Sequence, residues 1–201
     1  MNFGPIKLPR LVFFYAAIVL TAVLCICMFY LQKEALEDEL LKWQEEAQRL
    51  KNELERIKRY TEIYQTSPEI IALVLRESEK YKIDPTMMLE LIKLESKFTA
   101  NAISPHGAIG LCQIRPETAE ELARELGLPP EKELLFNAEY NIKLGTYFLS
   151  KLLDIYDKDY HKALTAYNRG PAGLLAYMKK RGTAVSTYSR RISEGLALNT
   201  Y

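Results

Sequence analysis

The chain begins with one long apolar segment. Residues 11–31 read LVFFYAAIVLTAVLCICMFYL and include no charged side chain. A helix of this length would span about 30 Å, the thickness of the hydrocarbon core of a bilayer. A cleaved signal peptide would need small residues at its cleavage site, but the end of this run offers Leu24, Ile26 and Met28 instead. We therefore predict an uncleaved transmembrane signal anchor.

A different pattern follows over residues 32–65, where apolar residues recur at alternating spacings of four and three positions. This seam consists of Leu36, Leu40, Trp43, Ala47, Leu50, Leu54, Ile57, Thr61 and Tyr64. A heptad repeat of this length predicts a coiled-coil stalk. In a parallel pair, Glu46 at a g position would meet Lys51 at an e position of the partner, and Glu53 would meet Lys58. We therefore expect a parallel homodimer, with a single stalk packed on its own domain as the alternative.

Short amphipathic stretches fill the rest of the chain, residues 67–201. Ser67 and Pro68 interrupt the heptads and are typical of a helix N-cap and first turn. We predict helices over residues 68–81, 85–97, 116–126, 138–156, 160–167, 171–180 and 186–197. Strand patterns with a period of two are essentially absent. The pattern predicts an all-α domain of about 135 residues, large enough for its own core.

The composition excludes several classes of protein. The chain has 27 Lys and Arg against 26 Asp and Glu, a balance that argues against a dedicated nucleic-acid binder. Three cysteines, two of them in the apolar run, cannot form a disulfide framework. His106 and His161 have no partners at the spacing of metal ligands, so we expect neither a metal nor a cofactor.

One carboxylate stands on the apolar face of the helix predicted over residues 85–97. Met88, Leu91, Ile92 and Glu95 follow a helical spacing that places them on one side. The opposite, polar face is predicted to carry Thr86, Glu90, Lys93 and Lys97. Burial would raise the pKa of Glu95 and suit it to act as a general acid. A glutamate that reaches into water from a frayed helix end is the alternative.

The loop after this helix contains residues suited to sugar recognition. Gly107 and Gly110 lie at the two ends of a tightly bent segment. Because glycine has no side chain, a ligand could approach the main chain closely there. The amide of Gln113 can both donate and accept hydrogen bonds. The Lys-Ser/Thr pair that a phosphate loop requires is missing.

Three short motifs occur in order along this part of the chain. They are Glu95-Ser96, Gly107-x-x-Gly110-Leu111-Cys112-Gln113, and Ala166-Tyr167-Asn168-Arg169-Gly170-Pro171. Together with the Asn141-Ile142-x-x-Gly145 segment and Tyr188, they resemble the lytic transglycosylase domain of the soluble-lytic-transglycosylase (SLT) type, which has a goose-lysozyme-like fold. Cys112 stands where this family usually has Met. The resemblance covers residues 68–201 and excludes the anchor and the stalk.

The resemblance implies a peptidoglycan lytic transglycosylase. Glu95 would protonate the bond between N-acetylmuramic acid (MurNAc) and N-acetylglucosamine (GlcNAc), and then act as a base to give a 1,6-anhydro end. The hydroxyl of Tyr167 would reach Glu95 and help to fix it. The substrate-binding positions would be Ser104, Gly110, Gln113, Asn168 and Tyr188. Alternatively, Asn168 would stabilise the turn at Gly170 instead of contacting the substrate.

Two other functions remain open from the residues. A hydrolytic muramidase of the same fold would need a second carboxylate, for which Glu90 and Glu117 are the nearby candidates. A non-catalytic scaffold would bind glycan without cleaving it and would serve an assembly of the cell envelope.

Placement follows from the substrate, because peptidoglycan lies outside the cytoplasmic membrane. Residues 1–10 would form a cytoplasmic tail, and residues 11–31 would cross the inner membrane once. The catalytic domain, residues 67–201, would then be periplasmic. The expected partners are peptidoglycan glycan strands, the membrane, a second copy of the chain and an envelope-spanning assembly, but no nucleic acid.

Overall fold

The computed structural model describes residues 10–199, so most of the expected cytoplasmic tail lies outside the described residues. The described chain is helical, and its only β-type pairings are isolated bridges that join Ile109 to Ile103 and to Ile114. The elements are α1 (Arg10–Tyr64), α2 (Pro68–Tyr81), α3 (Pro85–Ser96), α4 (Pro116–Leu126), the 3₁₀ helix η1 (Lys132–Phe136), α5 (Ala138–Ile155), α6 (Tyr160–Arg181) and α7 (Thr187–Asn199). The all-α prediction is confirmed.

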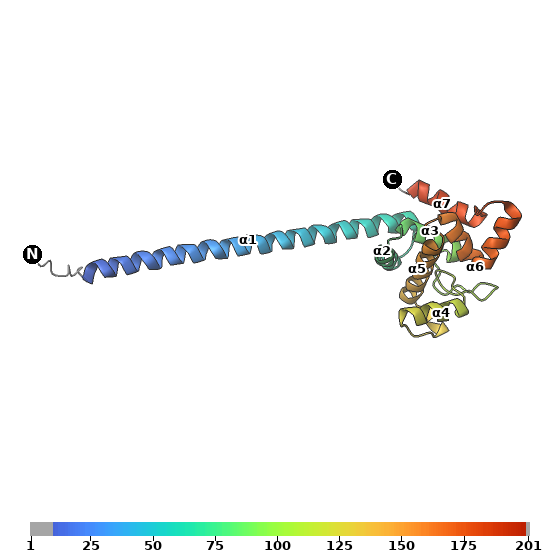
Figure 1. Cartoon of the computed structure of the whole chain (residues 1–201), viewed down its shortest axis with the longest axis horizontal. Coiled ribbons are helices and arrows are strands. Elements are labelled where there is room, and N and C mark those ends of the chain that lie inside the picture. The colour runs from blue at the N-terminus through green and yellow to red at the C-terminus, as the bar shows by residue number, and fades with distance from the viewer. Residues whose placement is uncertain (1–9, 200–201) are drawn as a thin grey trace, which may run out of the picture. The chain divides into compact units, whose positions relative to one another are not determined.

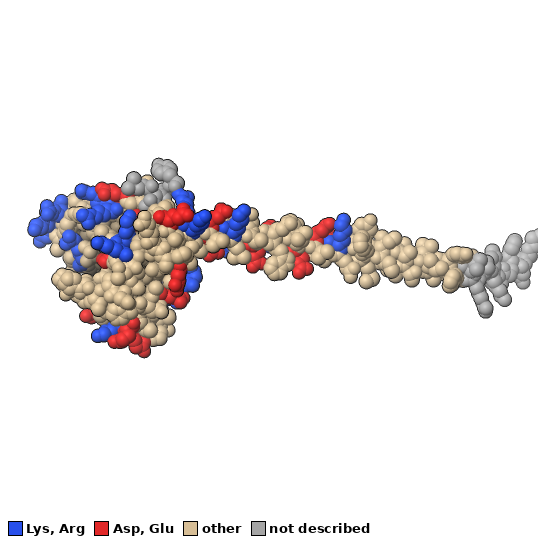
Figure 2. All heavy atoms as spheres, turned by 180° about the vertical axis from the view of Figure 1, so that it is seen from behind, with Lys and Arg blue, Asp and Glu red and all other residues tan. Residues whose placement is uncertain are grey.

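Helix α1 contains the apolar segment and the heptad seam without a break. Its most apolar window has a mean hydropathy of 2.7 and none of it is buried, so α1 is long and apolar enough to cross a membrane. Figure 2 shows this part of α1 as uncharged surface. The seam positions Leu36, Leu40, Trp43, Leu50 and Leu54 are all exposed.

The chain divides into two compact units, residues 1–55 and 56–201. The last turns of α1 belong to the second unit, because Ile57, Tyr60 and Tyr64 pack against its core. The final heptad positions of the predicted stalk are therefore used within the domain, and the exposed seam ends at Leu54.

Helix α3 forms the centre of the domain. Its side chains Met87, Met88, Leu89, Leu91 and Ile92 are almost completely buried. It packs against α2 and α7, while α5 packs against α2 and α6. Helices α4 and α7 lie at opposite ends of the domain (Figure 1). This packing fixes the last turn of α3, where Glu95 is located.

Side-chain caps define the start of several helices, as the sequence predicts. The hydroxyl of Ser67 accepts a hydrogen bond from the amide of Ile70 at 3.2 Å, and Asp84 accepts one from Thr86 at 2.8 Å. In each helix a proline follows the cap, where its missing N–H costs nothing. These caps fix the residues at which α2 and α3 begin.

Helix α6 joins two predicted helices across a kink. Gly170 has φ 74° and ψ 162°, values outside the helical region, and Pro171 begins the second half.

The element missed by the sequence analysis is η1, whose five residues are too few for a periodic signal.

The predicted polar face of α3 is wrong at two positions. Thr86 and Glu90 are both buried, Thr86 beside Tyr60 at the end of α1 and Glu90 under α7. Gly195 of α7 makes the crossing possible, since a β-carbon there would lie 2.3 Å from Cδ of Glu90. Lys93 lies 3.4 Å from the Glu90 carboxylate and compensates part of its buried charge.

Candidate active site

Glu95 opens into a cleft of about 480 Å³ in the domain. The cleft is lined by the last turn of α3, the loop that follows it, the start of α4, and parts of α5 and α6. Of the predicted site residues, the structure brings together Glu95, Ser104, Gln113, Tyr167 and Asn168 in its lining. Glu95 is half-buried, and its neighbours Leu91 and Ile92 are fully buried beneath it.

Tyr188 of α7 holds the carboxylate of Glu95. Its hydroxyl donates a hydrogen bond to Oε1 of Glu95 at 2.7 Å. Burial raises the pKa of Glu95, and the bond from Tyr188 partly opposes this rise because it favours the charged form. The pKa of Tyr188 is itself raised well above its usual range, mainly by burial and then by the Glu95 charge, so Tyr188 remains a proton donor.

Tyr167 occupies a different position from the one expected. Its hydroxyl donates to the main-chain carbonyl of Cys112 at 3.0 Å, and its ring packs on Phe148 at a centroid distance of 4.9 Å. The expected bond from Tyr167 to Glu95 is therefore replaced by the one from Tyr188. Tyr167 remains beside Glu95 in the cleft lining and braces the 110–113 turn against α6.

Asn141 fixes the loop that forms one wall of the cleft. Its Oδ1 accepts from the amide of Cys112 at 2.7 Å, and its Nδ2 donates to the carbonyls of Ile109 and Leu135 at 3.0 and 2.8 Å. Asn141 is fully buried, so each of these bonds replaces a lost contact with water. The sequence marked this residue only as part of a family-like segment, without a function.

Gly110 serves packing rather than substrate contact. It is buried, has φ 81°, and is absent from the cleft lining. A β-carbon at this position would lie 2.2 Å from Nδ2 of Asn141 and 2.4 Å from the carbonyl oxygen of Leu135. We therefore remove Gly110 from the residues expected to touch substrate.

Gln113 and Ser104 both use part of their hydrogen-bonding capacity within the loop. Nε2 of Gln113 donates to the carbonyls of Ala102 and Gly110 at 3.1 and 2.8 Å, so its Oε1 is the atom left to accept from a ligand. The hydroxyl of Ser104 accepts from the amide of Ala108 at 3.0 Å and can still donate its own proton. Asn168 is exposed and also lines the cleft.

The charges in the cleft are unevenly distributed. Among the described residues that line it, Glu95 is the one carboxylate. Glu90 lies buried under α7, and Glu117, in the first turn of α4, is exposed outside the lining. Within residues 10–199, no group of three or more His, Cys, Asp or Glu is arranged to hold a metal ion.

Several residues of the lining were missed by the sequence analysis. Arg115, Phe148 and Arg169 contribute to the cleft walls. Arg169 occupies the variable position of the third motif, which could have marked it. Phe148 carries no local signal, because an aromatic residue in an amphipathic helix is as easily part of the core.

Comparisons with known proteins agree with this geometry. The family model for the transglycosylase SLT domain matches residues 72–188. The membrane-bound lytic murein transglycosylase C of Glaesserella parasuis is 35% identical over 115 residues, which cover 52% of this chain and 32% of the relative. The protein of the same name from Histophilus somni is 32% identical over 135 residues, or 62% of this chain and 37% of the relative. The chain thus matches about one third of the length of these relatives.

Solved structures support the same fold. The lytic transglycosylase Slt of Pseudomonas aeruginosa aligns with a TM-score of 0.54 and 25% identity over 64% of this chain and 24% of that one. The 70 kDa soluble lytic transglycosylase of Escherichia coli aligns with a TM-score of 0.51 and 24% identity, over 62% and 21% of the two chains. With the family model covering more than half of its residues, the chain belongs to the transglycosylase SLT domain family.

Proposed function

We propose that this chain is a membrane-anchored lytic transglycosylase, which cleaves the β-1,4 bond between MurNAc and GlcNAc in peptidoglycan without water. The observation that carries the proposal is that, within residues 10–199, Glu95 is the one carboxylate lining the cleft and its pKa is raised by burial. A carboxyl group of this kind holds its proton at a higher pH than an exposed one and can deliver it to a leaving oxygen.

The reaction needs one protein group in two successive roles. Glu95 gives its proton to the glycosidic oxygen as the bond to C1 of MurNAc breaks, and the GlcNAc end leaves as an alcohol. The carboxylate then takes the proton of the C6 hydroxyl of the same MurNAc, whose oxygen bonds to C1 and closes the 1,6-anhydro ring. Because the nucleophile belongs to the substrate, its high effective concentration replaces a positioned water. Glu95 ends the cycle protonated.

The two tyrosines would support different parts of this cycle. Tyr188 donates to the Glu95 carboxylate at 2.7 Å and would stabilise it between the two proton transfers. Tyr167 would position the cleft wall through the carbonyl of Cys112 and bind substrate with its exposed edge. We keep Ser104, Gln113 and Asn168 as proposed substrate contacts.

The hydrolytic alternative is less well supported. An inverting glycosidase places its two carboxyl groups about 6.5–9.5 Å apart, on opposite sides of the bond, and a retaining one about 5–5.5 Å apart. Neither Glu90 nor Glu117 lines the cleft, so neither is available for this task. A purely glycan-binding scaffold would not need a half-buried carboxylate held by a tyrosine.

Digestion of purified peptidoglycan tests the proposal. We expect the wild type to release fragments with 1,6-anhydro-MurNAc ends, read by mass spectrometry. Glu95→Gln should lose activity by about 10⁴-fold or more, since one residue holds both acid and base roles. Glu117→Gln is the matched control and should keep full activity. Reducing ends, or normal turnover by Glu95→Gln, would exclude the mechanism.

We further propose that α1 anchors the domain in the inner membrane with a single pass, and that the domain lies on the periplasmic side. The support is the length and apolar composition of α1 and the location of peptidoglycan. Protease treatment of spheroplasts should degrade the domain. Protection in intact spheroplasts and digestion only after lysis would contradict this topology.

The exposed seam of α1 supports a parallel homodimer. Leu36, Leu40, Trp43, Leu50 and Leu54 are more than half exposed, so they have no partner within the described chain. Replacing Leu50 and Leu54 with Asp should dissociate the detergent-solubilised dimer, measured by light scattering. Cleavage by the domain should be unaffected, because neither residue belongs to the cleft. A monomeric wild type would exclude the dimer but leave the catalytic proposal intact.

A further inference from the structure

Arg169 is a cation held in a defined position at the wall of the cleft. Its side chain lies over the ring of Tyr177, with Cζ 4.9 Å from the ring centroid. Such a cation–π contact restricts a flexible arginine while leaving its N–H groups free to bind. Tyr177 is fixed in turn, because its hydroxyl donates to the carbonyl of Val185 at 3.3 Å.

The kink of α6 creates this arrangement. In an unbroken helix, β-carbons four residues apart lie about 5–6 Å from each other. Here a β-carbon at Gly173 would lie 2.8 Å from Cβ of Arg169, because Gly170 turns the chain between them. The glycine at position 173 therefore gives the arginine side chain room to cross the start of the second half-helix and reach Tyr177.

The surroundings of Arg169 favour an anion. The cleft lining also includes Arg115, and among the described residues that form it Glu95 is the one carboxylate. Among the described residues, no ion pair joins Arg169 to a carboxylate. The second half of α6 and α7 add Lys179, Lys180, Arg181, Arg190 and Arg191 against the single acid Glu194. Figure 2 shows Lys and Arg side chains gathered on one part of the domain surface, which would attract anionic substrates.

We propose that Arg169 binds a carboxylate of the peptide stem attached to the MurNAc unit under attack, and so makes the enzyme prefer stems with free carboxylates. This inference rests on the proposed function. The sugar that loses its C1 bond also carries the stem, through its lactyl group, so the stem must leave the cleft close to Glu95. In intact peptidoglycan the lactyl carboxyl is amide-linked and uncharged. The stem therefore supplies the carboxylates near the reacting sugar.

The experiment compares three forms of the same glycan strands. The first carries stems with free carboxylates, the second carries stems whose carboxylates have been amidated, and the third has lost its stems and exposes the lactyl carboxylate. We expect the wild type to cleave the first form with a kcat/KM about 5- to 10-fold higher than the second, as for one well-oriented charged hydrogen bond. In Arg169→Gln this ratio should fall to about one. The wild-type ratio should also shrink in high salt.

Matched variants separate recognition from folding. Lys180→Gln removes an exposed positive charge outside the cleft and should keep the wild-type ratio. Tyr177→Leu removes the ring beneath the guanidinium and should lower the ratio, whereas Tyr177→Phe keeps the ring and should retain it.

Each result has a defined meaning. Equal losses on the free and amidated forms in Arg169→Gln, or a wild-type ratio of one, would overturn the inference. A loss of the same size on the stem-free form would assign the arginine to the lactyl carboxylate and overturn the stem assignment. A wild type that cleaves none of the three forms would refute the proposed function itself.

Discussion

The hydrogen bond between Tyr188 and Glu95 provides the sharpest test of the site. Replacing Tyr188 with Phe removes a 2.7 Å donor to Oε1 of Glu95 and keeps the ring, which packs against the core. A hydrogen bond to a charged group contributes about 1.5–3 kcal/mol, and the lower end applies here because Glu95 is only half-buried. A loss of this size in the transition state lowers kcat by about tenfold.

The direction in which the pH profile should shift depends on whether the hydrogen bond from Tyr188 favours the charged or the protonated form of Glu95. Tyr188 stabilises the carboxylate and thereby holds the pKa of Glu95 below the value that burial alone would give. Its loss should raise the pKa of Glu95. In the proposed mechanism Glu95 must be protonated to begin the reaction, so activity should fall as pH rises through this pKa. The alkaline limb of the kcat profile in Tyr188→Phe should therefore move to higher pH.

The assay is the release of soluble anhydro-ended fragments, measured over a pH series at saturating substrate. Thermal unfolding of Tyr188→Phe serves as the control, since an unchanged midpoint shows that packing is retained. A variant with lower kcat but an unmoved alkaline limb would refute the reasoning, because Tyr188 would then act on substrate rather than on Glu95. A limb that moved to lower pH would contradict the sign of the effect.

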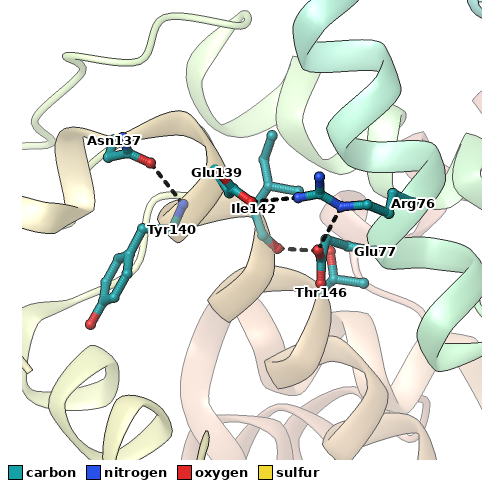
Figure 3. Close-up of polar contacts among 7 residues, drawn as sticks. All are labelled: Arg76, Glu77, Asn137, Glu139, Tyr140, Ile142 and Thr146. Atoms are coloured by element: carbon teal, nitrogen blue, oxygen red, sulfur yellow. Dashed lines mark hydrogen bonds and ion pairs between the residues drawn. The ribbon is translucent and has the colours of Figure 1, made fainter. Parts of the chain in front are cut away.

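Two stability predictions concern the scaffold of the site. Arg76 bridges buried Glu77 at 3.2 Å and exposed Glu139 at 2.7 Å (Figure 3). Arg76→Met should cost about 1–2 kcal/mol in urea unfolding because Glu77 loses its counter-ion, while Glu139→Gln should cost less than about 0.5 kcal/mol. Gly110→Ala should cost about 2–4 kcal/mol through its clash with Asn141, whereas Gly107→Ala, with φ 78° and open space around it, should cost about 1–2 kcal/mol. Equal losses within either pair would contradict these assignments.

The sequence correctly predicted those structural features that depend on one helix alone. The starts of α2 and α3 were predictable because Ser67 and Asp84 cap them and a proline follows each cap. The apolar stripe of α3 predicted the burial of Met88, Leu91 and Ile92, and with it the apolar surroundings of Glu95. Local chemistry and periodicity are sufficient for such features.

Features that depend on how two helices cross were not predictable in this way. Glu90 follows a polar spacing along α3, yet α7 covers it because Gly195 allows the two helices to approach closely. Gly110 lies in a loop from which the sequence predicted contact with a sugar, yet Asn141 and Leu135, both far along the chain, occupy the space beside it. In each case a glycine is required by a distant neighbour, and the sequence shows the glycine without the neighbour.

The two tyrosines illustrate the same limit within the site. Both belong to segments that resemble the family, and the sequence assigned the contact with Glu95 to Tyr167. The choice between them depends on the turn at residues 110–113, which Asn141 fixes so that the carbonyl of Cys112 lies 3.0 Å from the Tyr167 hydroxyl. With that donor used, the carboxylate takes its bond from Tyr188 on α7. The Glu95 carboxylate is therefore held by the same helix that buries Glu90, so changes in the packing of α7 on α3 should alter the pKa of Glu95 without touching the cleft.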